Sequence, residues 1–200
     1  MDAEALLKEI RRLERVCAFI DNSNLFQSMR SLYDKATRLD YCVLRDYLAA
    51  GRSIDCRFYY SMAAQPFSEE YRQQYEKSRK FYEGLSSLGF HMTCLPLRER
   101  VINDVTVPTE KGLDCEIVYD MCMLSRTGAY KSFVLVAGDE DYARTVKRTR
   151  SETGLTVDVA FFGGNCTSTN LVKEASRFLD LSLVDDIFKG RRACRRLQPV

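Results

Sequence analysis

The chain has 200 residues, with 30 Lys and Arg against 28 Asp and Glu and a formal net charge of +2. Hydrophobic residues make up 46% and charged residues 29%, which is typical of a globular protein and excludes a disordered or fibrous chain. The only histidine, His91, excludes mechanisms that need two histidines and zinc sites with two or more histidine ligands. If the chain is an enzyme, carboxylates or thiols must therefore carry most of the chemistry.

The lack of a membrane span or signal peptide and the pattern of cysteines both favour a cytoplasmic protein. No stretch approaches the roughly 18–20 apolar residues that span a bilayer, and residues 1–15 lack the apolar segment of a signal peptide. We therefore expect no membrane partner. The eight cysteines form no CxxC pair and lie in apolar segments, so reduced and mostly buried thiols are favoured over a disulfide framework.

The charge is unevenly distributed along the chain. Residues 189–200 hold five bases and no acid, so the other 188 residues hold 25 bases against 28 acids. A basic tail often serves an anionic partner, although a solubilising end explains it equally well. We therefore divide the chain into a lead-in helix at 1–15, one domain at 16–183 and a basic tail at 184–200.

The predicted elements alternate between helix and strand. The first half contains a helix at 6–15, a strand at 16–20 (VCAFI), helices at 25–32 and 41–50, a strand at 54–62, a helix at 68–88 and a strand at 91–95. The second half contains a hairpin at 98–102 and 105–107, a helix at 112–125, a strand at 132–137 (SFVLVA), a helix at 141–152, a strand at 156–161, a helix at 167–176 and a short edge element at 178–183. Continuous apolar strands between long helices predict a single α/β domain, with a mainly parallel sheet of about five strands covered on both faces.

Acidic residues follow the apolar strands, and in open α/β sheets sites form beyond the carboxyl ends of strands. Asp21 comes directly after VCAFI, Asp139 and Asp141 follow SFVLVA, and Asp114 opens the helix after the hairpin. Carboxylates that converge in one crevice repel one another, and a divalent cation relieves that repulsion. Carboxylate oxygens favour hard cations such as Mg²⁺ or Mn²⁺.

These residues also have a purely structural explanation. Asp and Asn are preferred at helix N-caps, so Asn24, Asp114 and Asp139 could each simply start a helix. Other site motifs are absent: the chain has no GxxxxGK[ST], no GxGxxG and no GxSxG. A phosphatase with an aspartyl nucleophile would carry an acid two residues after Asp21, where Ser23 stands.

Four segments together resemble the NYN domain, the LabA-like branch of the PIN-domain-like nucleases. They are FIDNSNLF at 19–26, KGLDCEIVYDM at 111–121, VLVAGDEDY at 134–142 and VAFFGGNCTSTNLVKEASRFLDL at 159–181. The resemblance covers residues 16–181. It implies a Rossmann-like, PIN-like three-layer α/β/α sandwich with a metal-dependent ribonuclease site made of acidic residues.

The resemblance also assigns site residues position by position. Asp21, Asp114, Asp139 and Asp141 fall on the acidic positions that hold the metal and act in catalysis, and the supporting positions are Asn22, Asn24 and Lys111. Two residues depart from the family pattern: Ala137 stands where many relatives carry Ser, and Glu140 adds an acid.

The helix after SFVLVA carries bases that suit a nucleic-acid partner. Arg144, Lys147 and Arg148 recur at helical spacing, and phosphate contacts by such residues give affinity that depends on salt and not on sequence. Tyr142 is a candidate for stacking on a base, with core packing as its structural alternative. His91, at the start of a strand, is interpreted as structural.

The hypothesis from the sequence is Mg²⁺- or Mn²⁺-dependent endoribonucleolytic hydrolysis of RNA, single-stranded or structured. Lys111 is a candidate contact for the scissile phosphate. A homodimer is the other partnership considered. Two alternatives stay open: a non-catalytic RNA-binding or regulatory module, and a metal-dependent phosphohydrolase of small phosphate esters.

Overall fold

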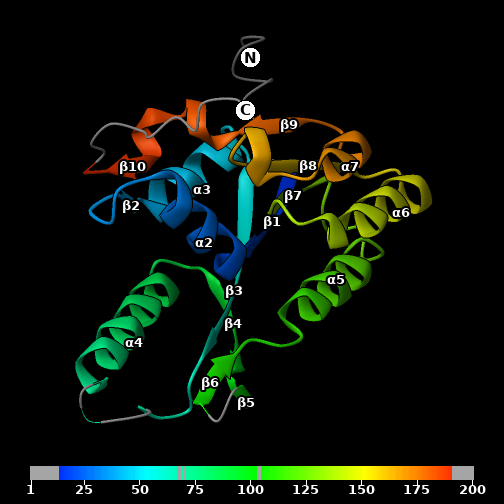
Figure 1. The fold of residues 1–200 in the computed structure, drawn as a ribbon. Helices are drawn as coiled ribbons and strands as arrows, with labels where there is room; N and C mark the ends of the chain where they lie inside the picture. Colours follow the sequence, from blue (N-terminus) through cyan, green and yellow to red (C-terminus); the bar gives the residue numbers. More distant parts are fainter. Residues whose placement is uncertain (1–13, 67–68, 70, 103–104, 191–200) are drawn as a thin grey trace.

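A six-stranded parallel sheet forms the centre of the molecule, in the order β4-β3-β1-β7-β8-β9 (Figure 1). The computed structural model describes residues 14–66, 69, 71–102 and 105–190, without the side chains of residues 99–107. The sheet strands are β1 (Arg15–Asp21), β3 (Ser53–Met62), β4 (His91–Pro96), β7 (Ser132–Val136), β8 (Thr156–Phe161) and β9 (Phe178–Asp180). Each parallel connection needs a crossover, which the helices supply.

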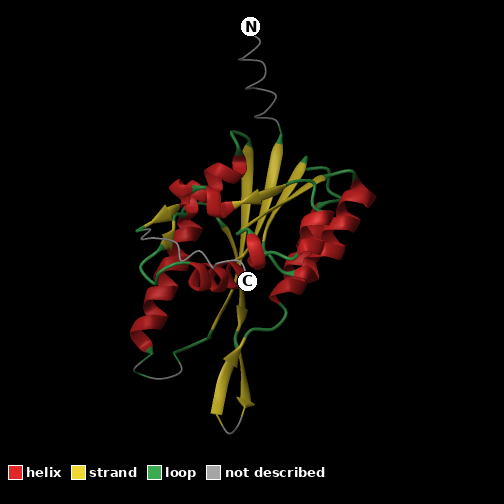
Figure 2. Cartoon of the chain, turned by 45° about the horizontal axis from the view of Figure 1, so that its top comes forward, coloured by secondary structure: helices red, strands yellow, loops and turns green. Residues whose placement is uncertain are grey.

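Helices cover both faces of this sheet and complete the three layers (Figure 2). The longer ones are α2 (Asn22–Leu32), α3 (Tyr41–Ala49), α4 (Arg72–Ser87), α5 (Leu113–Leu124), α6 (Ala143–Thr153) and α7 (Thr169–Glu174). Short 3₁₀ turns are η1 (Glu140–Tyr142), η2 (Gly164–Cys166), η3 (Leu181–Leu183) and η4 (Asp185–Ile187). None of the described helices is long and apolar enough to cross a membrane.

Alternation along the strands divides the core into two halves, because successive residues of a strand point to opposite faces. In β1, Ala18 and Ile20 pack on the α2–α3–α4 side, whereas Phe19 packs on the α5–α6–α7 side. All three side chains are fully buried. The continuous apolar run that predicted a strand buried on both faces is thereby explained.

A hairpin of β5 (Arg98–Ile102) and β6 (Val105–Thr109) follows β4 and projects beyond the end of the sheet (Figure 2). It returns the chain to the carboxyl-end edge of the sheet at Glu110, where α5 begins after Gly112. Gly112 has a φ of 88°, a left-handed conformation that glycine adopts without strain. The hairpin therefore delivers the start of α5 to the candidate site.

The α/β sandwich predicted from the sequence is confirmed, with six sheet strands where about five were expected. The additional strand is β9, a half-buried three-residue segment within the predicted edge element. Residues 185–189, assigned to the basic tail, instead form η4 and β10 (Phe188–Lys189), which pairs with β2 (Arg38–Leu39). Most of the lead-in helix at 1–15 and the tail from 191 onward lie outside the described residues.

The cysteines differ in part from the expectation. The seven cysteines within the described residues are free, as predicted, but only Cys17 and Cys56 are buried, whereas Cys94, Cys115 and Cys122 are exposed. The exposed thiols lie on the outer faces of their strand or helix, and the apolar residues around them in the sequence do not show which face a cysteine takes. His91 begins β4, as expected, and is exposed there.

Candidate active site

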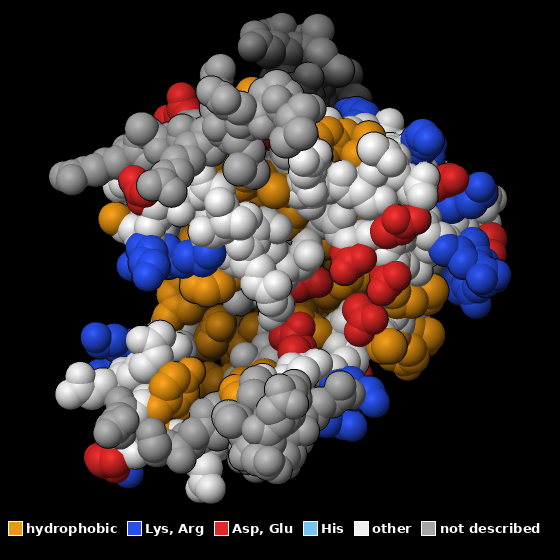
Figure 3. Space-filling view, in the orientation of Figure 1, with side chains coloured by type: hydrophobic (Ala, Val, Ile, Leu, Met, Phe, Trp, Pro, Cys, Tyr) orange, Lys and Arg blue, Asp and Glu red, His pale blue; other side chains and the backbone are white. Residues whose placement is uncertain are grey.

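The carboxyl ends of β1 and β7 are neighbours in the sheet, since Ile20 pairs with Val136 in the parallel register. Asp21 ends β1, and the turn after β7 carries Asp139 and Asp141. The first turn of α5 adds Asp114. Figure 3 shows acidic side chains gathered on this face of the molecule. Three distant parts of the chain thus meet as the sequence predicted.

These acids line a single open cavity of about 180 Å³. Its walls combine predicted and unpredicted residues: Asp21, Ser23, Asn24, Gln27, Glu110, Lys111, Gly112, Leu113, Asp114, Asp139, Asp141 and Tyr142. All four predicted acids are among them. We call this space the acidic cavity.

Asp21 forms the buried wall of the acidic cavity and is only 7% exposed. Its Oδ1 accepts a hydrogen bond from the backbone N–H of Asn24 at 3.0 Å, and its Oδ2 accepts one from the Tyr142 hydroxyl at 2.8 Å. Burial raises the pKa of Asp21, and Glu110 and Asp139 raise it further, whereas the two hydrogen bonds lower it. Ionisation of the Asp21 carboxyl therefore costs free energy in the folded protein, and a nearby cation would offset this cost.

Asn24 and Gly138 fix the geometry between the two strand ends. The Asn24 side-chain Oδ1 accepts a hydrogen bond from the Gly138 N–H at 2.8 Å, across 114 residues of sequence. A Cβ on Gly138 would lie 2.2 Å from the carbonyl oxygen of Cys166, so only glycine fits there. Asp139 caps η1 by accepting from the Asp141 N–H at 3.1 Å.

The capping explanation holds for Asp139 and fails for two other residues. Asn24 lies inside α2, which Asp21 caps, and Asp114 lies in the first turn of α5, for which Gly112 is the N-cap. Asp114 and Asp141 are exposed, and no described group donates a hydrogen bond to the Asp114 carboxylate. These two acids are thus free to meet a ligand.

The sequence did not identify Glu110, Ser23 and Gln27 as site residues. The Ser23 hydroxyl donates to Glu110 Oε2 at 2.5 Å, which joins α2 to the segment before α5. A signal existed for the α2 residues, because Ser23 and Gln27 are four apart and share a helix face. For Glu110 the only signal was its position next to Lys111.

Asn22 and Tyr142 differ from what the sequence suggested. Asn22 points away from the acidic cavity: its Oδ1 accepts from the Tyr41 hydroxyl at 2.8 Å and its Nδ2 lies 3.5 Å from the Tyr82 hydroxyl. Tyr142 is only 1% exposed, so stacking on an RNA base is wrong for this residue. Its hydroxyl holds Asp21 from the wall of the acidic cavity. Glu140, by contrast, lies outside the cavity and accepts a hydrogen bond from the Asn170 side chain.

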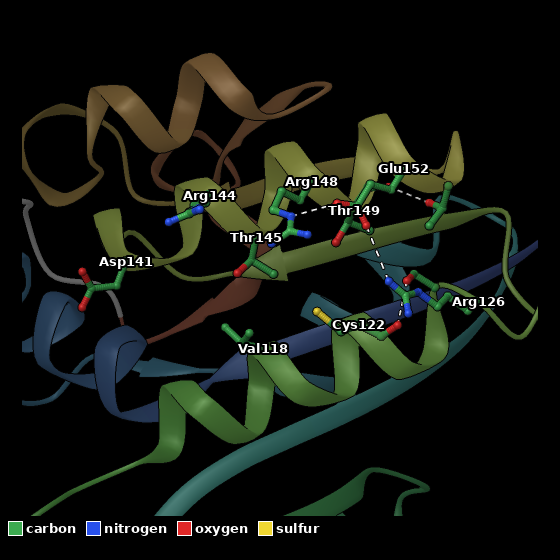
Figure 4. Close-up of a pocket in the computed structure, with 11 residues that line it drawn as sticks. Val118, Cys122, Arg126, Asp141, Arg144, Thr145, Arg148, Thr149 and Glu152 are labelled. Carbon is green, nitrogen blue, oxygen red and sulfur yellow. Dashed lines mark hydrogen bonds and ion pairs between the residues drawn. The ribbon is translucent and has the colours of Figure 1, made fainter.

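The predicted basic residues of α6 differ in how free they are. Lys147 pairs with Glu174 at 3.1 Å and Arg148 with Glu152 at 2.8 Å, whereas no described acid pairs with Arg144. Arg144 and Arg148 line a groove of about 370 Å³ between α5 and α6 (Figure 4). Asp141 lines both this groove and the acidic cavity, so the two adjoin each other.

The donor chemistry of the acidic cavity fits a hard divalent cation, because its acids present only oxygen ligands. Within the part of the chain that the structure describes, however, no three His, Cys, Asp or Glu side chains come close enough together to hold a metal ion. The carboxylates therefore share one space without forming a ready-made ligand cluster.

Comparisons with known proteins agree with the fold and the four segments. The family model of the NYN domain matches residues 15–182. The chain belongs to the NYN domain family. This family is part of the PIN-like nuclease superfamily, which makes nuclease chemistry the first function to consider for the acidic cavity.

A solved structure of low sequence identity shares the architecture. A protein of unknown function, VPA0982, from Vibrio parahaemolyticus is 20% identical with a TM-score of 0.68, over 89% of this chain and 98% of that one. MurG from Acinetobacter baumannii is 9% identical with a TM-score of 0.39, over 82% of this chain and 40% of that one. No curated protein matches the NYN chain in sequence.

Proposed function

We propose that this NYN domain is an endoribonuclease that hydrolyses RNA phosphodiester bonds with Mg²⁺ or Mn²⁺. The observation that carries the proposal is the acidic cavity, where acids from separate chain segments surround the buried Asp21. Gathering like charges at a sheet edge costs stability, and family membership supplies the chemistry that would justify this cost.

Asp21, Asp114, Asp139 and Asp141 are the residues that would hold the cation. A bound divalent cation would neutralise charge on the phosphate and make a water molecule a better nucleophile, so no histidine base is needed. Asp21 is fixed by Tyr142 and Asn24, and the exposed Asp139 is held by the N–H of Asp141. The exposed Asp114 and Asp141 can adjust their side chains.

The bases near the acidic cavity would position the RNA. Lys111 lines the cavity itself and would contact the phosphate next to the acids. Arg144, which no described acid neutralises, lines the adjoining groove and would hold a flanking phosphate, with weaker support from the paired Lys147 and Arg148.

One observation favours a second candidate, an RNA-binding module that cleaves little. The acids do not form a three-ligand cluster among the described residues, so binding could persist without an efficient metal site. Such a module would retain RNA affinity through Arg144 and Lys111 and show no metal-dependent turnover.

The test is incubation of the purified chain with labelled single-stranded and structured RNA, in Mn²⁺ and in EDTA. Asp114→Asn and Asp139→Asn should lose cleavage, and Asp34→Asn, an exposed acid outside the acidic cavity, should not. Cleavage that survives EDTA would refute the metal site, and binding without cleavage would favour the module. Turnover of small phosphate esters alone would assign a phosphohydrolase instead.

A further inference from the structure

Helix α4 presents aromatic side chains beside the acidic cavity. Phe81 is 44% exposed, although a ring of this size is usually buried. Its neighbour Tyr82 is half-buried and stacks on Tyr60 of β3, with ring centroids 3.8 Å apart and planes at 26°. Phe81 lies 5.2 Å from Tyr82, so the rings form one continuous surface.

This surface reaches the residue that follows Asp21. The Tyr82 hydroxyl lies 3.5 Å from the Asn22 amide, and the Phe81 ring lies 5.7 Å from Tyr41, whose hydroxyl donates to the same amide. The aromatic side chains of α4 therefore lie against the residue next to Asp21, on the side of Asn22 that faces away from the acidic cavity.

Helix α2 carries a further exposed ring one turn beyond Asn22. Phe26 is four residues after Asn22, one turn along the same helix face, and is 46% exposed. The guanidinium of Arg30 lies 4.8 Å from the centre of its ring. Figure 3 shows hydrophobic side chains lining the hollow between α2 and α4, which runs up to the cluster of acids.

The charge on α4 suits an anionic occupant of this hollow. The helix holds four bases against two acids, and Arg79 bridges both acids, Glu76 and Glu83. The exposed Lys77 and Lys80 have no acidic partner among the described residues. Lys77 lies one helical turn before Phe81 on the same face, which places a cation next to the exposed ring.

We propose that Phe81, Tyr82 and Phe26 form an aromatic platform on which unpaired bases of RNA stack beside the acidic cavity. The proposal rests on the proposed function in that RNA is the ligand. Aromatic rings bind any base face, while Lys77 and Lys80 attract the phosphates. The platform thus selects single-stranded segments, because paired bases do not expose their faces.

The experiment measures fluorescence anisotropy of a labelled oligoadenylate in EDTA, so that binding is read without cleavage. Phe81→Ala should weaken binding about fivefold or more, Phe81→Trp should keep wild-type affinity, and Tyr47→Ala, an exposed tyrosine of α3, should change nothing. An abasic oligomer of equal length should bind Phe81→Ala and the wild type equally, since it offers phosphates but no bases. Circular dichroism verifies the fold of each variant.

The outcomes separate the platform from the catalytic proposal. Unchanged affinity of Phe81→Ala, an equal loss with the abasic oligomer, or no RNA binding by the wild type would overturn the platform and leave its surface to a protein partner. Phe81-dependent binding without cleavage in Mn²⁺ would support the platform and refute the nuclease. Cleavage in Mn²⁺ together with unchanged RNA affinity of Phe81→Ala would support the nuclease and overturn the platform.

Discussion

The Tyr142 hydroxyl donates a 2.8 Å hydrogen bond to Oδ2 of Asp21, across 121 residues of sequence. It ties the end of β1 to the turn that starts α6 and orients the only acid of the acidic cavity whose side chain is buried. The hydrogen bond also lowers the pKa of Asp21, against the larger upward effect of burial.

Tyr142→Phe should therefore shift the pH profile of RNA cleavage. Without the hydroxyl the pKa of Asp21 rises further, so the acid limb of the rate profile moves to higher pH, and stability falls by about 1.5–3 kcal/mol. Tyr130→Phe is the matched control, because the Tyr130 hydroxyl donates to Asp55 at 2.7 Å away from the site. An unshifted acid limb in Tyr142→Phe would contradict the account of this pair.

Asp21→Asn should stabilise the cation-free protein at neutral pH. The raised pKa of Asp21 means that the folded state disfavours the ionised carboxylate. The free energy of unfolding therefore falls as the pH rises above the unfolded pKa of about 4, and it stops falling once the pH has passed the folded pKa. Below about pH 4 both states are protonated and the difference should vanish. Thermal unfolding in EDTA, at several pH values and beside Asp34→Asn, measures this. A lower melting temperature for Asp21→Asn at neutral pH would show that the ionised carboxylate does not destabilise the folded protein.

Arg144→Ala should weaken RNA binding more than Lys147→Ala or Arg148→Ala. The two latter side chains already pair with Glu174 and Glu152, whereas Arg144 has no described acid partner. In a plot of the logarithm of the binding constant against the logarithm of the salt concentration, Arg144→Ala should make the slope shallower by about 0.7–0.9, as expected for the loss of one phosphate contact. Equal effects of the three substitutions would mean that the ion pairs do not restrict RNA contact.

Gly138→Ala should destabilise the protein by about 1–3 kcal/mol or more, because the new Cβ would overlap the carbonyl oxygen of Cys166 and the Phe161 ring. Gly84→Ala is the control: it lies within α4 with no atom near its Cβ position, and should be about 0.5–1 kcal/mol more stable. Urea unfolding measures both, and a neutral Gly138→Ala would show that the turn after β7 can move.

Much of the fold followed from local pattern. The run VCAFI predicted β1 because a strand covered on both faces is apolar at every position. The sixth strand was less apparent, since β9 has three half-buried residues and is too short to show a period. The packing of 185–189 depends on pairing between Phe188 and Leu39, which no local pattern reveals.

The sequence predicted the site residues that lie at strand ends. It did not predict those whose place depends on the direction in which a side chain points. Asp21 and Asp139 meet because β1 and β7 are adjacent and parallel. Asn22 and Asn24 look alike in sequence, yet a helix turns about 100° per residue, so only Asn24 faces the acidic cavity. Glu110 comes into the cavity through a contact with Ser23, 87 residues away, which only the folded chain creates.

The most direct test of the nuclease proposal is the rate of RNA cleavage by wild type and by Asp21→Asn in Mn²⁺, with the fold of both verified by thermal unfolding. We predict metal-dependent cleavage by the wild type, abolished by EDTA, and background cleavage by a fully folded Asp21→Asn. Equal cleavage by the two proteins would contradict the assignment of the acidic cavity as the active site.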